Sequence, residues 1–503
     1  MSIIDRRTSQ MKKKSKRLIS LFLMIILALS MVTISLLQPR ESNDISSEHP
    51  VPARISYMSH APISIVTNGG FLDPNSSTGI SWGSGTIDDP YIIEGWDIDA
   101  VSGTGISIWW TDVYFIVRDC FVHNGTSSYR GIYLLDCMNG NINNNTCSDN
   151  SYGIYLQISS NNTLADNNCS LNMIYGMYLS SSNNNSLSNN TCWNNDDGIS
   201  FSRSSNNTLI NNNCSSNDYR GISLYYDSNN NTLSNNNCSS NNNYDGIYLY
   251  SSNNNTLSDN TCSSNNNWGI RFTSSSNNTL SNNNCSSNDY DGIYLDSSSN
   301  NTLFSNRGFW NTYNGIDVVA SNNNMLSGNI WSSNSYDGIY VSFSTNNTII
   351  NNNCSSNNRW GIQLWESHHN LIIFNQIRNN LQYGMNMREG SYSNIIFNNT
   401  FVDNNGAGSI YDLNHIQAID DGTNNWWNSS TYEHGNYWSD WTTPDNFPPW
   451  GIVDVPYNIS GSAGAKDYYP QTTAPIIPEP SILVLAGIMM MIFLMIGRTR
   501  KKP

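Results

Sequence analysis

Carboxylates recur at a fixed place in this 503-residue chain, one residue before a series of regularly spaced glycines. Asp245, Asp291 and Asp337 occupy this place, so that an acidic residue stands in every second repeat. Paired carboxylates can cleave glycosidic bonds when they lie about 5–5.5 Å or about 6.5–9.5 Å apart. Side chains two strands apart in a stack are separated by roughly 9.6 Å, which suits neither arrangement well. The alternative is that the alternation keeps like charges apart, with Arg220 between Asp197 and Asp245.

Tyrosines recur two residues after the same glycines. A line of exposed aromatic rings beside aspartates could stack on a long sugar chain and hydrogen-bond it. On this reading a polysaccharide or surface glycan is the partner, and no catalytic residue or metal ligand is assigned. The candidate ligand-binding residues are Tyr248, Tyr294, Tyr340, Asp245, Asp291 and Asp337. The alternative is that tyrosines on neighbouring strands only stabilise a sheet by stacking.

Eight of the ten cysteines are also in phase with the repeat, five residues after its Leu or Ile. In repeats without the cysteine, this slot holds Gly308, Trp331, Ile377 or Phe401. Because most of these substitutes are large and apolar, we expect buried free thiols that pack as small hydrophobic groups. A redox or metal-binding column is the alternative. Cys120 and Cys137 are out of phase and could pair with each other.

The glycines that set this phase indicate the architecture. In the repeat that begins at Gly246, Ile247 and Leu249 show the period of two that is typical of a strand, and no window shows helical spacing. The sequence therefore predicts an all-β fold, a right-handed parallel β-helix of about 13 coils of about 23 residues each, over residues 101–410. The glycines, at intervals of 22 to 25 residues, are Gly131, Gly153, Gly176, Gly198, Gly221, Gly246, Gly269, Gly292, Gly315, Gly338, Gly361, Gly384 and Gly408.

Asparagine supplies the polarity of the repeats, because only 12% of the chain is charged. Asn tolerates the left-handed backbone region, which suits a coil with up to three sharp turns, and stacked Asn side chains can form amide ladders. The NNT and NNS spelling also creates many N-x-S/T sequons, as in a glycoprotein. The repeat explains the same spelling without glycosylation.

The charge of the chain excludes one class of partner. The net charge is −15, and no lysine occurs between Lys16 and Lys466. Binding to nucleic acid requires clustered Lys and Arg for the phosphates. We therefore expect no nucleic-acid partner.

Both ends of the chain carry apolar runs beside basic residues. Residues 18–37 follow a basic tail, 1–17, and predict a signal peptide or a signal-anchor helix. Residues 481–497 precede a second basic tail, 498–503, and predict a transmembrane helix. Since Lys and Arg stay on the cytoplasmic side, the bulk of the chain is expected on the extracytoplasmic cell surface, anchored to the membrane.

The segments between these ends and the repeats complete the expected organisation. Pro478-Glu479-Pro480 and the tail after it resemble the PEP-type C-terminal sorting signals of prokaryotic surface proteins. The other expected segments are linkers at 38–60 and 471–480, an N-terminal capping region at 61–100 and a C-terminal capping region at 411–470.

Blocks on both sides of the repeats resemble a known family. The first is GSGTIDDPYIIEGWDI from Gly83, and the others are GNYWSD from Gly435, VPYNI from Val455 and DYYP from Asp467. With the repeats between them they look like the NosD-type β-helix proteins, often grouped with carbohydrate-binding and sugar-hydrolase β-helices. The resemblance implies the β-helix fold over roughly residues 60–470.

The same resemblance suggests two metals, copper and calcium, as candidate ligands. Founding members of the family are linked to copper supply for nitrous oxide reductase, whereas here the histidines are scattered and only His368 and His369 adjoin. Many relatives carry a D-x-D-x-D-G-like run suited to calcium. This chain retains only Asp445 and Asp454 in that segment. No cofactor is therefore predicted.

Three hypotheses for function follow. The first is a membrane-anchored, non-catalytic surface scaffold or glycan-binding protein. The second is a polysaccharide lyase or glycoside hydrolase that uses the Asp291 and Asp337 face of the coil. The third, implied only by the family resemblance, is a periplasmic-type copper-handling protein.

Overall fold

The computed structural model describes residues 57–476, apart from 73–77, 127 and 448–449. The apolar runs at 18–37 and 481–497 and the PEP-type segment lie outside the described residues, so their predicted roles stay predictions. Within the described ranges, no helix is long and apolar enough to cross a membrane.

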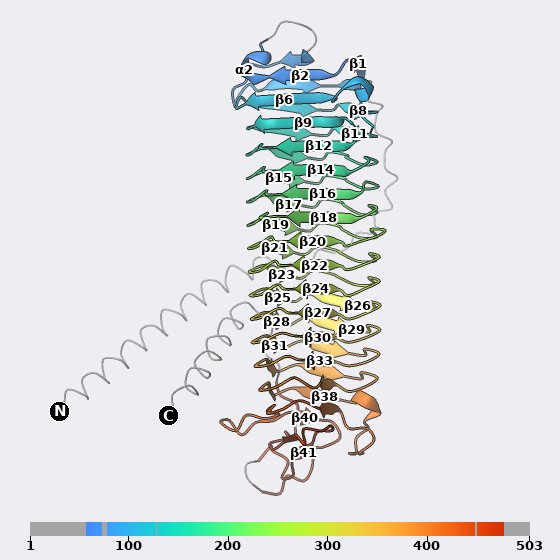
Figure 1. The fold of residues 1–503 in the computed structure, drawn as a ribbon, viewed down its shortest axis with the longest axis vertical. Coiled ribbons are helices and arrows are strands. Elements are labelled where there is room, and N and C mark those ends of the chain that lie inside the picture. The colour runs from blue at the N-terminus through green and yellow to red at the C-terminus, as the bar shows by residue number, and fades with distance from the viewer. Residues whose placement is uncertain (1–56, 73–77, 127, 448–449, 477–503) are drawn as a thin grey trace, which may run out of the picture. The chain divides into compact units, whose positions relative to one another are not determined.

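The described chain is a parallel β-solenoid, as the sequence predicts, with almost no helix (Figure 1). Each coil contributes one strand to sheet 1, one to sheet 2 and a short strand or bridge to a third side. Sheets 1 and 2 each contain 15 strands. The solenoid is therefore a little longer than the 13 predicted coils, partly because strands of sheet 1 precede the first repeat glycine.

Sheet 1 is parallel throughout. Its strands, in order, are β2 (Ile63–Val66), β6 (Ile106–Thr111), β9 (Arg130–Cys137), β12 (Tyr152–Gln157), β14 (Tyr175–Ser180), β16 (Asp197–Ser202), β18 (Arg220–Tyr225), β20 (Ile247–Tyr250), β22 (Ile270–Thr273), β24 (Ile293–Asp296), β27 (Ile316–Val319), β30 (Ile339–Ser342), β33 (Ile362–Trp365), β36 (Met385–Met387) and β39 (Ala418–Asp420).

Sheet 2 is parallel except at its first pair, β3 and β4. Its strands, in order, are β3 (Ile80–Trp82), β4 (Tyr91–Glu94), β7 (Phe115–Arg118), β10 (Gly140–Asn143), β13 (Thr163–Ala165), β15 (Ser186–Ser188), β17 (Thr208–Ile210), β19 (Thr232–Ser234), β21 (Thr256–Ser258), β23 (Thr279–Ser281), β25 (Thr302–Phe304), β28 (Met325–Ser327), β31 (Thr348–Ile350), β34 (Leu371–Ile373) and β37 (Ile395–Phe397).

The third side consists of two short sheets joined by single bridges, from Thr146–Asn168 to Asn284–Arg307. Its strands are β1 (Met58–His60), β5 (Trp96–Asp99), β8 (Phe121–His123), β11 (Thr146–Ser148), and then β26 (Arg307–Phe309), β29 (Ile330–Ser332), β32 (Asn353–Ser355), β35 (Gln376–Arg378), β38 (Thr400–Val402) and β40 (Tyr437–Trp438). The remaining elements are α2 (Thr67–Gly70), η2 (Ala100–Ser102), η3 (Asn404–Gly406) and the antiparallel pair β41 (Tyr457–Asn458) and β42 (Lys466–Asp467).

The core is a dry column of aliphatic and sulfur-bearing side chains. Ile247, Leu249 and Leu257 have no exposed surface, and neither does Cys262 in the cysteine slot. Trp331 occupies the same slot in register with Cys354. The prediction that this slot points inward is therefore confirmed, and all ten cysteines are free and buried.

The proposed pairing of Cys120 with Cys137 is wrong. Cys137 ends β9, where its thiol contacts the Ile108 carbonyl at 3.0 Å. Cys120 precedes β8 on the third side, where its thiol contacts the Arg118 carbonyl at 3.3 Å. The two residues lie at different corners of the coil, and each thiol donates a hydrogen bond to a backbone carbonyl.

Asparagine ladders hold three of the coil corners, which confirms the role predicted for this residue. Asn207 shows the pattern: its backbone N–H donates to Asn231 Oδ1 at 2.8 Å, and its Nδ2 donates to the Ser182 carbonyl at 3.1 Å. A serine ladder holds the fourth corner, where the Ser182 N–H donates to Ser204 Oγ at 3.0 Å. Each buried amide thus ties three coils together.

Most corners also contain a single residue with a left-handed backbone. In the coil after Gly198 these residues are Arg203, Asn206, Asn211 and Ser216, so a coil turns at four corners rather than the expected three at most. Asn206 is exposed, and the following Asn207 is buried in the ladder. The NNT spelling therefore combines a corner residue with a ladder residue.

The repeat glycines are required by the close approach of neighbouring coils. A Cβ on Gly246 would lie 2.6 Å from the Gly269 carbonyl oxygen and 2.7 Å from that of Cys238. Gly408 is the exception among the thirteen, because it is exposed in the segment between η3 and β39. Its assignment to the repeat is wrong, since β36 pairs directly with β39 across this insertion.

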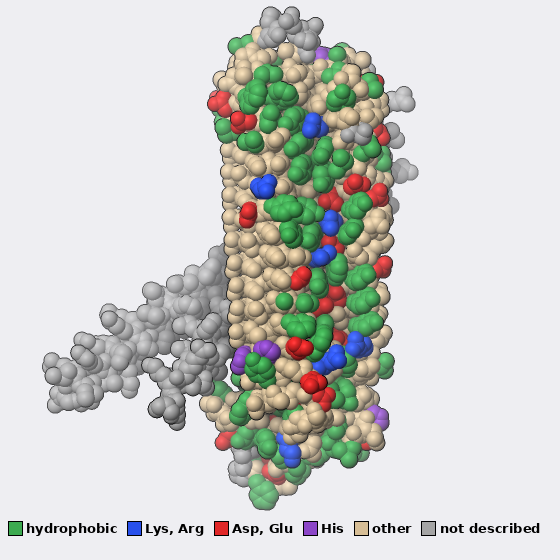
Figure 2. Space-filling view, in the orientation of Figure 1, with side chains coloured by type: hydrophobic (Ala, Val, Ile, Leu, Met, Phe, Trp, Pro, Cys, Tyr) green, Lys and Arg blue, Asp and Glu red, His purple; other side chains and the backbone are tan. Residues whose placement is uncertain are grey.

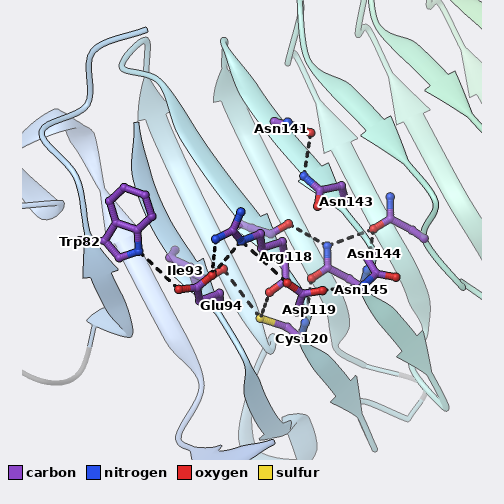
Figure 3. A network of polar contacts seen from close by, with 12 residues as sticks. Trp82, Ile93, Glu94, Arg118, Asp119, Cys120, Asn141, Asn143, Asn144 and Asn145 are labelled. Carbon is purple, nitrogen blue, oxygen red and sulfur yellow. Dashed lines mark hydrogen bonds and ion pairs between the residues drawn. The ribbon is translucent and has the colours of Figure 1, made fainter. Parts of the chain in front are cut away.

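The family-like blocks occupy the two ends of the solenoid. Near the N-terminal end, Arg118 Nε donates to Glu94 Oε2 at 2.7 Å, and Asn145 Oδ1 accepts the Cys120 N–H at the start of one ladder (Figure 3). At the C-terminal end, Trp438 stacks between Phe401 and Tyr457 with centroid distances of 4.2 and 4.1 Å. These aromatic rings close the end of the core.

Candidate functional site

Outward side chains of sheet 1 form one continuous stripe along the solenoid, which we call the outer track. Figure 2 shows apolar, acidic and basic side chains gathered over this sheet, beside surfaces that are mostly neutral and polar. One column of the track precedes the repeat glycines: Arg130, Tyr152, Tyr175, Asp197, Arg220, Asp245, Trp268, Asp291, Asn314, Asp337, Trp360 and Tyr383. The other follows them by two residues: Tyr133, Tyr155, Tyr178, Ser200, Ser223, Tyr248, Arg271, Tyr294, Asp317, Tyr340, Gln363 and Asn386.

The parallel register stacks the rings of the track directly on one another. Tyr155 lies between Tyr133 and Tyr178, with ring centroids 5.1 Å from each. Further along, Trp268 stacks on Tyr294 at 5.1 Å. Tyrosines on neighbouring strands therefore stack on one another, as the second interpretation of this column expects. Parts of these stacked rings are also exposed along the surface.

Arginines lie between the aromatic rings of the track. Arg220 Cζ is 4.7 Å from the Tyr248 ring centroid, and Arg220 Nε is 3.4 Å from Asp245 Oδ2. Arg271 Cζ is 4.5 Å from the Trp268 ring centroid and 5.1 Å from that of Tyr248. The structure thus places Arg220 beside Asp245, as the charge-alternation interpretation expects.

Tyr248 is less accessible than the sequence predicts. Its side chain is only 8% exposed, because Arg220 and Arg271 cover its ring. Tyr294 and Tyr340 are partly exposed. The expectation of a uniform line of exposed tyrosines is therefore wrong at Tyr248 and also at Tyr133, which is 8% exposed as well.

The candidate aspartates lie beneath the track surface rather than on it. Asp245, Asp291 and Asp337 are 0%, 5% and 2% exposed. Asp291 Oδ1 accepts the Asn314 N–H at 2.8 Å, and Asp337 Oδ1 accepts the Trp360 N–H at 3.2 Å. A residue just before the glycine can turn its carboxylate back to the next coil's backbone, and sequence spacing does not show this.

Burial makes these carboxylates weak acids. It raises the pKa of Asp245 and Asp291 to about 6. The charge of Arg220 opposes this shift at Asp245, and hydrogen bonds oppose it at Asp291. It raises the pKa of Asp337 to about 7, although Arg359 opposes the shift. The three groups therefore gain or lose protons close to neutral pH.

Asp317 is a track residue that the sequence reasoning missed. It lies in register between Tyr294 and Tyr340. Burial, with the charges of Asp291 and Asp337, raises its pKa well above 3.8, and its Oδ1 has no hydrogen-bond partner within the described residues. Its place two residues after Gly315 was the available signal, but the recurrence of tyrosine in that column hid it.

An open pocket of about 730 Å³ lies at the C-terminal end of the track. Arg359 and Trp360 belong to the first coil of this end, and Arg388 to a later one. Trp360, Tyr383 and Asn386 of the lining belong to the two columns of the track, so the pocket adjoins it. The lining residues are Arg359, Trp360, Tyr383, Asn386, Arg388, Glu389, Ile419, Asp421 and Ser462.

Fold and surface together define a parallel β-solenoid repeat protein with an aromatic and charged track along one sheet. A family model described as "Periplasmic copper-binding protein (NosD)" matches residues 64–242, 221–308 and 307–443. The chain belongs to this NosD family. A comparison with curated proteins gives no match.

Solved structures with similar backbones include a double mutant of the periplasmic alginate epimerase AlgG, with 13% identity and a TM-score of 0.44 over 66% of this chain and 84% of that one. They also include the Azotobacter vinelandii mannuronan C-5 epimerase AlgE4 A-module, with 13% identity and a TM-score of 0.34 over 64% and 87%. The Dettilon tailspike protein has 11% identity and a TM-score of 0.32 over 66% and 61%. Likenesses at these TM-scores carry no weight for the function of this chain.

Copper, which the family's description implies, does not fit the residues that the structure describes. In these ranges no group of three or more His, Cys, Asp or Glu side chains could hold a metal ion. Burial raises the pKa of Cys262 and Cys285, whereas a thiol must lose its proton to bind a metal. His368 stacks on Tyr392 with a centroid distance of 4.0 Å.

The segment compared with a calcium loop is held by its own backbone. Asp454 Oδ2 accepts the Asn446 N–H at 2.7 Å, and Asp445 Oδ2 accepts the Gly451 N–H at 2.9 Å. These carboxylates brace a turn.

Proposed function

We propose that this protein is an extracytoplasmic glycan-binding β-solenoid whose outer track holds an extended polysaccharide. The observation that carries the proposal is the series of stacked aromatic and Arg side chains along sheet 1, which ends in a pocket lined by Arg359, Trp360, Tyr383 and Arg388. Sugars bind proteins through aromatic faces and through planar polar groups that accept or donate hydrogen bonds to hydroxyls.

The geometry of a solenoid favours a polymer over a small sugar. Successive rungs repeat the same outward positions at roughly 4.8 Å, so contacts recur along an extended chain and can add up. Tyr294, Tyr340 and Trp360 supply partly exposed rings in successive parts of the track. Weak contacts at each of them would together give useful affinity.

The cellular location belongs to the same proposal. The family description places its members in the periplasm. The apolar ends at 18–37 and 481–497 would tether the solenoid with its bulk outside the cytoplasm. A polysaccharide or surface glycan is available there, and the net charge of −15 disfavours nucleic acid as a partner.

Affinity electrophoresis through gels that contain soluble polysaccharides tests the proposal. Wild-type protein should be retarded by at least one polymer, and Tyr340→Ala combined with Tyr294→Ala should weaken that retardation about tenfold, since each stacking contact contributes about 0.5–1.5 kcal/mol. Trp310→Ala is the matched control, because Trp310 is 68% exposed but lies beyond β26 on the third side. Equal loss in both variants, or no retardation by any polymer, would refute the proposal.

A polysaccharide-cleaving enzyme is the second candidate, and one observation favours it. The raised pKa of Asp317 keeps a proton on its carboxyl, which lies in register between Tyr294 and Tyr340, and a general acid needs such a proton. An assay for new reducing ends or unsaturated products decides this. Product that disappears in Asp317→Asn would support the enzyme, and the absence of product from every polymer that binds would exclude it.

A further inference from the structure

The pocket at the C-terminal end of the outer track brings together two arginines from neighbouring coils. Two guanidinium groups, Arg359 and Arg388, face it. Within the described ranges neither of them forms an ion pair with a carboxylate. Elsewhere on the track Arg220 is paired with Asp245, whereas Arg271 stacks on Trp268 and forms no ion pair among the described residues.

Aromatic rings hold these two arginines in place. Arg359 Cζ lies 3.9 Å from the Trp360 ring centroid and 5.0 Å from that of Tyr336. Arg388 Cζ lies 5.3 Å from the Trp365 ring centroid. A guanidinium stacked on a ring keeps its N–H groups free at the edge, ready to bind a carboxylate with two parallel hydrogen bonds.

The remaining lining suits the hydroxyl groups and apolar face of a sugar. Trp360 contributes its ring, and its buried Nε1 has no hydrogen-bond partner among the described residues. Glu389 and Asp421 provide acceptors, and Asp421 is held by the Ser462 N–H at 2.7 Å. Asn386 adds an amide at the pocket wall.

We propose that this pocket binds a uronic-acid residue of an acidic polysaccharide, with its carboxylate between Arg359 and Arg388. The proposal rests on the glycan-binding function above and gives it a substrate class. A simple anion would gain little from Glu389 and Asp421, which repel it, whereas a sugar acid uses the basic pair for its carboxylate and the acidic pair for its hydroxyls. A volume of about 730 Å³ lies within the range of ligand pockets, about 300–1,000 Å³.

Matched polymers separate this inference from the parent proposal. Polygalacturonate, polymannuronate and polyglucuronate oligomers would each be compared with their carboxyl-reduced, neutral counterparts by calorimetry on the wild-type protein. We expect at least one acidic oligomer to bind about tenfold or more tightly than its neutral counterpart, and Arg359→Gln with Arg388→Gln to remove that difference. The control pair, Arg203→Gln and Arg307→Gln, changes two exposed arginines outside the track and should keep it.

Each result has one meaning. If wild-type protein binds acidic and neutral oligomers equally, or if the Arg359 and Arg388 variant keeps the preference, the pocket assignment is wrong while glycan binding stands. If the control pair loses the preference as well, general charge attraction is responsible, and the pocket assignment is again wrong. If no oligomer or polymer binds the wild-type protein, the glycan-binding function itself fails.

Discussion

Replacing Asp337 with asparagine should stabilise the protein at alkaline pH and leave it almost unchanged in acid. The amide keeps the Oδ1 atom that accepts the Trp360 N–H, and it removes a charge from a side chain that is 2% exposed. Asn already occupies the same column one coil earlier, where Asn314 Oδ1 accepts the Asp337 N–H at 3.0 Å. The substitution therefore fits the local geometry.

The magnitude follows from the pKa of this carboxyl. A folded-state pKa of about 7 against the ordinary value of 3.8 corresponds to about 4 kcal/mol of destabilisation when Asp337 is fully ionised. The folded chain holds the proton of Asp337 more tightly than the unfolded chain does. The folded protein therefore has its full stability below about pH 4 and loses about 4 kcal/mol as the pH rises through 7. Asp337→Asn should gain up to about 4 kcal/mol at pH 9 and less than about 1 kcal/mol at pH 4.

Thermal unfolding followed by circular dichroism measures the effect. With about 2.1 cal/mol/K per residue over a solenoid of roughly 400 residues, the gain at pH 9 corresponds to a rise in Tm of about 4–5 °C. Asp289→Asn, at an exposed carboxylate, is the matched control. A fall in Tm at pH 9, or the same rise at pH 4 and pH 9, would show that Asp337 stays ionised and paired with Arg359, contrary to this reasoning.

Three further predictions test the solenoid itself. Asn283→Ala should lower the free energy of unfolding in urea by about 3 kcal/mol or more, because it leaves the Asn260 N–H and the Leu257 carbonyl without their partner, while Asn282→Gly at the exposed corner should change it by less than about 1 kcal/mol; equal effects would refute the ladder argument. Gly246→Ala should destabilise by about 1–3 kcal/mol through its clash with neighbouring carbonyls, whereas Gly103→Ala, with open space around the added Cβ, should be tolerated, and the reverse order would contradict the packing. All ten thiols should resist an aromatic disulfide reagent at pH 8 until denaturant is added, and rapid labelling of the native chain would contradict a dry core.

The sequence predicts the fold well because every coil of a solenoid places the same requirements on the residues at equivalent positions. The glycine spacing, the inward cysteine slot and the asparagine ladders each recur in many coils, so a local pattern reports a contact between neighbouring coils. The assignment of Gly408 to the repeat was wrong because this glycine belongs to an insertion. It has the spacing of the repeat but lies outside the sheet. Cys120 and Cys137 misled because sequence phase does not show which corner of a coil a residue occupies.

The candidate site was less predictable. The columns could be read from the sequence, but the direction of a side chain just before the glycine depends on the backbone of the next coil, so Asp245, Asp291 and Asp337 proved to be buried. The pocket could not be foreseen, because it forms only when the C-terminal segment around Ser462 folds back beside β39, more than 70 residues after Arg388. Asp317 was within reach, since its place in the column was known.

Oxidative footprinting with a bound polysaccharide tests the central claim most directly. Hydroxyl radicals label accessible aromatic side chains, and a ligand protects those that it covers. We predict protection of Tyr294, Tyr340, Trp360 and Tyr383 on the outer track, with unchanged labelling of Trp310 and Tyr432 elsewhere on the surface. Protection confined to residues outside the track, or no protection at a saturating concentration of a polymer that binds, would contradict the account.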